Sequence, residues 1–227
     1  MAKTFNCINQ QIDSSWYPFF SKPDVLKEVY KVHSIIHDDK KNSQEYHPVD
    51  YFEIFRLVPL HSIRVVFIGQ EPYPNSGNAT GIAFCVDKEV DVDELEGEVK
   101  SIKVMLKASG ASGIIDGNVH HWFKQGVFMF NVSLTYDQKK SAGNRSGHDI
   151  LWRPFITKLL TFISDNTNSI FVFFSVRIYS IFNSFINKDR SMIIAVSHPS
   201  TVITIKDSWK VNPFEYVNDM LIPEIIW

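Results

Sequence analysis

The sequence SIRVVFIGQEPYP, residues 62–74, joins a short apolar run to a polar loop. The run over 62–68 is rich in β-branched residues and too short for a helix, so it predicts a buried strand. The loop cannot continue that strand, because Pro72 and Pro74 each fix the backbone φ angle and lack an N–H donor. We therefore expect a rigid loop at the carboxyl end of a central strand.

Alternating strands and helices are predicted on either side of this stretch. Apolar runs predict three more strands, at 126–132, 170–174 and 192–196. Apolar residues at helical spacing predict helices at 26–36, 51–57, around 99–106 and at 151–164, while residues 38–48 are expected to form a loop. Nearly continuous apolar strands are typical of a parallel sheet that is covered on both faces. We expect a single α/β domain over 1–227, with a short central parallel sheet flanked by helices on both faces.

The composition excludes several classes of protein. Of 227 residues, 44% are hydrophobic, which is enough for a core and excludes disordered and collagen-like chains. The net charge of −2 argues against a general polyanion binder, although a local basic face is compatible with it. Cys7 and Cys85 lie far apart without metal-ligand spacing, so neither a disulfide framework, a metal site nor a cofactor is expected.

Ligands collect at the carboxyl ends of parallel strands, and three segments with functional side chains are expected there. They are GQEPYP at 69–74, Asn131 at the end of one strand, and SHPSTV at 197–202 after the last strand. Taken singly, Glu71 could be a surface carboxylate, Asn131 a turn residue and His198 a helix cap. Together they predict one site at this edge of the sheet. No nucleotide-binding glycine motif is present, which argues against a nucleotide-binding α/β enzyme.

Four motifs follow one another along the chain: GQEPYP at 69–74, GIAF at 81–84, Asn131 and HPS at 198–200. Their order and spacing resemble those of the uracil-DNA glycosylase family of cellular and viral enzymes. The resemblance extends over most of the chain, from about Trp16 to Trp227. It implies the glycosylase fold and a hydrolase that flips uracil out of DNA and cleaves its N-glycosidic bond in base excision repair. No lysine lies in the motif loops, so water rather than an amine is the expected nucleophile of a monofunctional enzyme.

The resemblance also implies which residues bind the base. A flipped base must be stacked and recognised by its polar edge. Phe84 is expected to stack on uracil, and the amide of Asn131 offers the donors and the acceptor that distinguish uracil from cytosine. Tyr73 is expected to press on the C5 edge and exclude the methyl group of thymine.

Cleavage places positive charge on the sugar and negative charge on the departing base. By resemblance, the Glu71 carboxylate stabilises the sugar and orients water, His198 donates to uracil O2, and Gln70 completes the contacts to the base. Two hydroxyl residues and one apolar residue are expected to contact DNA: Ser200 and Thr201 grip phosphates, and Val202 enters the gap left by the flipped nucleotide.

Several positions depart from the family pattern. Glu71 stands where the family has Asp, and a displacement of about 1 Å at a reacting oxygen can cost about a hundredfold in rate. Reduced activity is therefore expected, and the alternative function is a catalytically weakened DNA-binding or replication scaffold. Pro74 replaces a His, Val202 replaces a Leu, and Phe174-Ser175 stands in place of Trp-Gly. The residue near 144–148 that grips phosphate stays open between Asn144, Ser146 and His148.

The expected partners are single- and double-stranded DNA containing uracil, with a protein inhibitor or a replication protein as further partners that the resemblance allows. We expect a monomer without membrane contact, since no apolar stretch approaches the roughly 18 residues of a membrane span. No secretory signal is visible, so a cytoplasmic location is expected for a bacterial protein and an intracellular one, in the infected host, for a viral protein.

Overall fold

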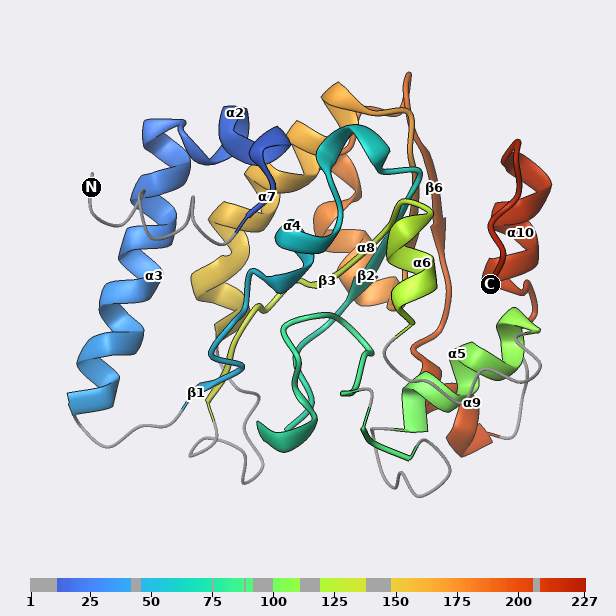
Figure 1. Ribbon diagram of the computed structural model, residues 1–227, viewed down its shortest axis with the longest axis horizontal. Coiled ribbons are helices and arrows are strands. Elements are labelled where there is room, and N and C mark those ends of the chain that lie inside the picture. The colour runs from blue at the N-terminus through green and yellow to red at the C-terminus, as the bar shows by residue number, and fades with distance from the viewer. Residues whose placement is uncertain are drawn as a thin grey trace.

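The computed structural model describes residues 12–41, 46–74, 76–87, 89–91, 100–110, 119–137, 148–205 and 209–227. Its centre is a four-stranded sheet in the order β3-β2-β5-β6, in which all pairs are parallel (Figure 1). The strands are β2 (Val65–Gly69), β3 (Val127–Asn131), β5 (Ile170–Phe173) and β6 (Met192–Ala195). The predicted parallel sheet is therefore confirmed, with each strand inside or within one residue of its expected range.

The register of the sheet brings the predicted motif segments to one edge. Gly69 at the end of β2 lies opposite Asn131 at the end of β3. Every residue of β2, β3 and β5 is buried, which explains why these strands are continuously apolar. The edge strand β6 is only partly buried.

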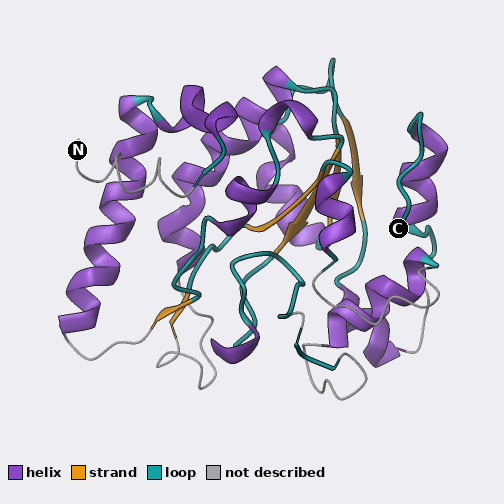
Figure 2. Cartoon of the chain, in the orientation of Figure 1, coloured by secondary structure: helices purple, strands orange, loops and turns teal. Residues whose placement is uncertain are grey.

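Helices cover both faces of the sheet, as expected, and Figure 2 shows them as the purple layer on each side. On one side lie α2 (Tyr17–Phe20), α3 (Pro23–Lys41), α4 (Glu53–Leu57) and α7 (His148–Asn166). On the other lie α5 (Ser101–Ser109), α6 (His120–Lys124), α9 (Pro199–Ile205) and α10 (Pro213–Met220), while α8 (Val176–Phe182) follows β5. No helix among the described residues is long and apolar enough to span a membrane.

Aromatic side chains fill the space between the sheet and each helix layer. On one face, the Trp16 ring centroid lies 5.2 Å from that of Phe128 in β3. On the opposite face, Phe67 in β2 stacks on Trp227 at 5.6 Å and meets Phe214 of α10 at the same distance. The abundant aromatic residues therefore form two cores that fix the sheet from both sides.

Some elements differ from the sequence-based expectations. Helix α3 continues to Lys41, so the first part of the expected loop at 38–48 is helical. The strand expected from residue 62 begins at Val65, because Leu60–Ser62 form a 3₁₀ turn. A second sheet pairs β1 (Tyr46–His47) with β4 (Tyr136–Asp137), and such two-residue strands are too short to leave a periodic pattern. The beginning of the helix expected around 99–106 lies outside the described residues.

Candidate active site

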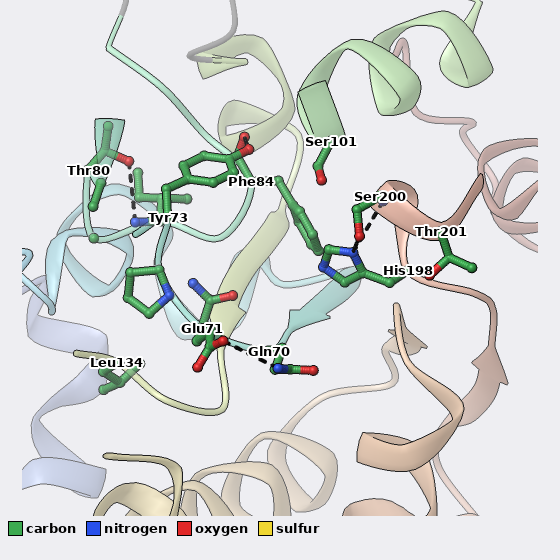
Figure 3. A pocket seen from close by; sticks show the side chains of 15 residues that line it. Gln70, Glu71, Tyr73, Thr80, Phe84, Ser101, Leu134, His198, Ser200 and Thr201 are labelled. Carbon is green, nitrogen blue, oxygen red and sulfur yellow. Dashed lines mark hydrogen bonds between the residues drawn. The ribbon is translucent and has the colours of Figure 1, made fainter. Parts of the chain in front are cut away.

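A cavity of about 230 Å³ opens at the carboxyl ends of β2 and β3 (Figure 3). It brings together all the residues that were expected to bind the base or take part in catalysis. Its lining consists of Gln70, Glu71, Pro72, Tyr73, Ala79, Thr80, Gly81, Ile82, Phe84, Ser101, Asn131, Leu134, His198, Ser200 and Thr201. No group of three or more His, Cys, Asp or Glu residues suited to a metal ion occurs among the described residues.

The loop that bears Gln70 and Glu71 is held in line with the end of β3. The Val132 N–H donates to the Gly69 carbonyl at 3.1 Å, and the Ser133 N–H donates to the Gln70 carbonyl at 3.0 Å. The ladder between β2 and β3 thus continues beyond both strands. It fixes the backbone from which the Glu71 carboxylate projects into the cavity, next to the Gln70 side chain (Figure 3).

Gly69 permits the close approach of two cavity residues. A Cβ atom at this position would lie 2.3 Å from Asn131 Oδ1 and 3.1 Å from Phe84 Cζ, and the first contact is too short for any real side chain. Asn131 is only 7% exposed and lines the cavity from the end of β3. The absence of a side chain at Gly69 therefore allows the amide and the phenyl ring to meet over the end of β2.

Phe84 adopts a backbone conformation that is rare for a large side chain. Its φ of 64° lies in the left-handed region, a strain that the surrounding contacts must offset. The Tyr73 hydroxyl donates to the Phe84 carbonyl at 2.7 Å, and the Phe174 ring packs edge-on at 5.1 Å. These contacts fix the aromatic wall of the cavity before any ligand enters.

His198 is held in one orientation by Ser200. The backbone N–H of Ser200 donates to His198 Nδ1 at 3.2 Å, and the Ser200 hydroxyl lies 2.7 Å from the same nitrogen. Because Nδ1 accepts, the proton of the neutral ring lies on Nε2. Burial lowers the pKa of His198 from 6.5 to about 4, so the imidazole is neutral at pH 7.

The residues expected to contact DNA begin helix α9. Thr201 is exposed at the cavity mouth, whereas the Ser200 hydroxyl turns toward His198 (Figure 3). Val202 is half-buried and does not line the cavity. Ser200 therefore orients the histidine, a contact that the sequence analysis did not anticipate.

Sequence reasoning missed four cavity residues: Ala79, Thr80, Ser101 and Leu134. Ser101 is 1% exposed, and its hydroxyl lacks a hydrogen-bond partner in the described part of the chain. It begins the amphipathic helix α5, but a serine before an apolar period also suits a solvated helix end. The sequence alone therefore gave no signal that its hydroxyl lines a cavity.

Of the three residues left open as phosphate ligands, His148 is buried inside the protein. Its Nδ1 lies 2.9 Å from Thr135 Oγ1, which also accepts a hydrogen bond from Trp152 Nε1 at 2.8 Å. This network packs α7 against the segment after β3 and leaves His148 away from the surface. Asn144 and Ser146 lie outside the described residues.

Comparisons with known proteins agree with the motifs. A family model described as "Uracil DNA glycosylase superfamily" matches residues 55–221. A uracil-DNA glycosylase of Borreliella burgdorferi strain ZS7 is 30% identical over 195 residues, covering 84% of each chain. That of Psychromonas ingrahamii is 24% identical and covers 94% of this chain and all of its own.

Solved structures show the same fold. The mimivirus uracil-DNA glycosylase superposes with a TM-score of 0.77 at 22% identity, covering 96% of this chain and 88% of the other. Its Y322F variant in complex with UGI superposes with a TM-score of 0.79 at 21% identity, covering 96% and 90%. Each superposition covers 96% of this chain, so the likeness concerns the fold rather than a single motif.

Proposed function

Because the chain belongs to the uracil-DNA glycosylase superfamily, whose members are DNA-repair hydrolases of N-glycosyl bonds, we propose that it flips uracil out of DNA and hydrolyses the bond between the base and the deoxyribose. One observation carries this proposal. A carboxylate, a neutral histidine, a buried amide and two aromatic rings, from four separate segments, line the same cavity. A monofunctional reaction with water as nucleophile follows from the absence of lysine among these lining residues.

Selection of the base falls to Phe84, Asn131 and Tyr73. Phe84 presents a fixed ring for stacking, and the buried amide of Asn131 pairs with the polar edge of uracil. A cytosine presents the opposite donor and acceptor pattern, which would leave buried polar groups unpaired. Tyr73 closes the C5 side of the cavity, so the additional methyl group of thymine meets its ring.

His198 stabilises the negative charge that develops on the departing base. With Nδ1 engaged by Ser200, the free donor is the N–H at Nε2, and the ring lines the cavity. A neutral donor strengthens its hydrogen bond as the oxygen of uracil becomes anionic, which favours the transition state over the bound substrate.

Glu71 acts on the sugar side of the reaction. Its carboxylate stabilises the cationic sugar through space and orients the attacking water. The side chain is one methylene longer than that of the family's aspartate and reaches the same oxygen position by adopting a bent rotamer. Activity is therefore present, although slower than in an enzyme with aspartate at this position.

Contacts with DNA extend outward from the cavity mouth. Thr201 offers a hydroxyl group for phosphates, Ser200 combines a phosphate contact with its hold on His198, and Val202 supplies the wedge. Single- and double-stranded DNA both serve as substrates of a monomer formed by one domain over 1–227. Since a mimivirus relative is solved in complex with UGI, a protein partner of that kind is included in this proposal.

The decisive experiment measures release of free uracil from a single-stranded oligonucleotide at enzyme excess, together with binding of the same strand. Glu71→Gln keeps the size and removes the charge, so it should slow release at least about a hundredfold with little change in DNA affinity. Glu71→Asp should be as fast as the parent protein or faster. A parent protein that binds DNA but releases no uracil, with no gain in Glu71→Asp, would contradict the proposal and favour the scaffold alternative.

A further inference from the structure

His47 lies behind the wall of the cavity and contacts the loop that bears Tyr73. Its Nε2 is 2.8 Å from the Tyr73 carbonyl oxygen, and the residue is 4% exposed. Because a carbonyl can only accept, Nε2 must carry the proton of this hydrogen bond. His47 thus holds the backbone of Tyr73, while the Phe84 carbonyl holds its hydroxyl at the other end.

His47 also touches the segment that follows Asn131. It lies opposite Tyr136 in the pairing of β1 with β4, and the two rings stack with centroids 5.3 Å apart. The residue therefore joins the Tyr73 loop to the chain that continues from Asn131. A shift of β1 would therefore be transmitted to Tyr73 and to Asn131.

Packing alone does not account for a histidine at this position. Its second nitrogen, Nδ1, is buried and has no hydrogen-bond partner among the described residues. Burying an unpaired polar atom is unfavourable, and an apolar ring could stack on Tyr136 without that cost. The feature that an apolar ring could not supply is the single hydrogen bond to Tyr73.

We propose that His47 is a positioning residue for base selection, which holds Tyr73 at the distance that excludes the methyl group of thymine. This inference rests on the proposed function, in which Tyr73 closes the C5 side of the cavity. To reject a methyl group by steric contact, the Tyr73 ring must be placed to within a fraction of an ångström. One methyl group in a closely fitting pocket changes the reaction rate by about 10- to 200-fold. Loss of the His47 hydrogen bond frees the backbone of Tyr73 and opens that space.

The test compares single-turnover release of thymine and uracil from matched single-stranded oligonucleotides. His47→Phe keeps the ring that stacks on Tyr136 and removes the donor, so the ratio of thymine to uracil release should rise about tenfold. His47→Gln places an amide nitrogen near the position of Nε2 and should restore most of the discrimination. His47→Asn, whose shorter amide cannot reach the carbonyl, should behave like His47→Phe. The exposed His61 provides a matched control in His61→Phe, and DNA affinity should stay unchanged throughout.

Each outcome supports or overturns the inference. Tyr73→Ala must admit thymine, which establishes that Tyr73 excludes it. If Tyr73→Ala admits thymine while His47→Phe and His47→Asn, both folded by circular dichroism, discriminate as well as the parent, the role of His47 is refuted. Equal loss of discrimination in His47→Gln and His47→Phe would mean that a hydrogen-bond donor at this position does not restore the placement of Tyr73, and it would also refute the inference. A parent protein that releases no uracil would instead overturn the proposed function, and this inference with it.

Discussion

The two sides of the cavity are built differently. The base-recognition side, formed by Tyr73, Phe84 and Asn131, is buried or half-buried and fixed by hydrogen bonds and close contacts with Gly69. The DNA-facing side, formed by residues 200–202 at the start of α9, is half-buried or exposed. Its Ser200 is directed toward His198 rather than toward solvent.

This difference follows from what each side must do. Uracil differs from thymine by one methyl group and from cytosine by one amino group. To discriminate among these bases, the side chains of the cavity must be in position before the base enters, since a cavity that rearranged around each base would admit the wrong one. Contacts with phosphates carry no sequence information and tolerate adjustment at the surface. Substitutions on the base-recognition side should therefore have larger effects than those on the DNA-facing side.

The largest effect is expected from Gly69→Ala, which places a side chain at the end of β2 against the base-recognition side. The new Cβ would overlap Asn131 Oδ1 and crowd Phe84. Displacement of either group by about 1 Å should lower kcat/KM for uracil release by about a hundredfold or more. Steady-state kinetics on a uracil-containing oligonucleotide measure this loss. Gly110→Ala is the matched control, because nothing lies within 4 Å of a Cβ there and only its positive φ is strained.

Gly110→Ala should lower stability by about 1 kcal/mol and leave kcat/KM unchanged. If Gly69→Ala retained the activity of the parent protein, the close fit of Asn131 and Phe84 would not matter for catalysis.

A smaller but more specific effect is expected from Asn131→Asp. The carboxylate keeps the shape of the side chain and loses both amide donors. Uracil release should fall by about tenfold to a hundredfold, while release of cytosine becomes detectable. The comparison uses single-turnover rates on oligonucleotides that carry each base. Unchanged selectivity would place Asn131 outside the base contacts.

The pH dependence of stability tests the burial of His198, which joins the two sides. Its pKa is about 4 in the folded protein and about 6.5 in the unfolded chain, so the unfolded chain binds more protons as the pH falls. Its neutral, buried state therefore destabilises the fold progressively between pH 6.5 and 4, by at most about 3 kcal/mol. Urea denaturation at pH 7 and pH 4.5 measures this loss.

His198→Gln, which does not titrate, should show a smaller loss of stability between these two pH values. An identical loss in both proteins would mean that His198 is not buried in the neutral form. The pH dependence of kcat/KM offers a second check. Because His198 is neutral above about pH 4, its protonation should not lower the activity of the parent enzyme near pH 6.5. A fall in activity near pH 6.5 that occurs in the parent enzyme and is absent in His198→Gln would contradict this.

The smallest effect is expected on the DNA-facing side, from Val202→Ala. A shorter wedge should slow uracil release from a duplex by about three- to tenfold, because less of the gap left by the base is filled. Release from a single strand, which needs no wedge, should not change. A loss on both substrates would indicate a role in the cavity rather than in the duplex.

The sequence was sufficient to predict the sheet and the segments at its edge. The strands β2, β3 and β5 are buried on both faces, so their apolar runs are unambiguous, and parallel pairing brings Glu71 and Asn131 to one end. Short elements could not be predicted in the same way. The pairing of His47 with Tyr136 depends on contacts between residues 89 positions apart, which no local period records.

The roles of Gly69 and Ser200 were also beyond sequence reasoning. Glycine at a strand end suits many turns, and only the positions of Asn131 and Phe84 show that a side chain has no room there. From the sequence, a serine after His-Pro could equally well contact a phosphate or form a hydrogen bond with the histidine. The choice between them is made by the first turn of α9, which directs the hydroxyl back to Nδ1.

The most direct test of the central claim, that the base-recognition side is preformed for uracil, is a single-turnover assay with three oligonucleotides. They differ only in carrying uracil, thymine or cytosine at one position, and the released base is quantified at enzyme excess. We predict that the parent protein releases uracil and leaves thymine and cytosine in place at the longest times measured. Release of all three bases at similar rates, or of none from a folded protein that binds the strands, would contradict it.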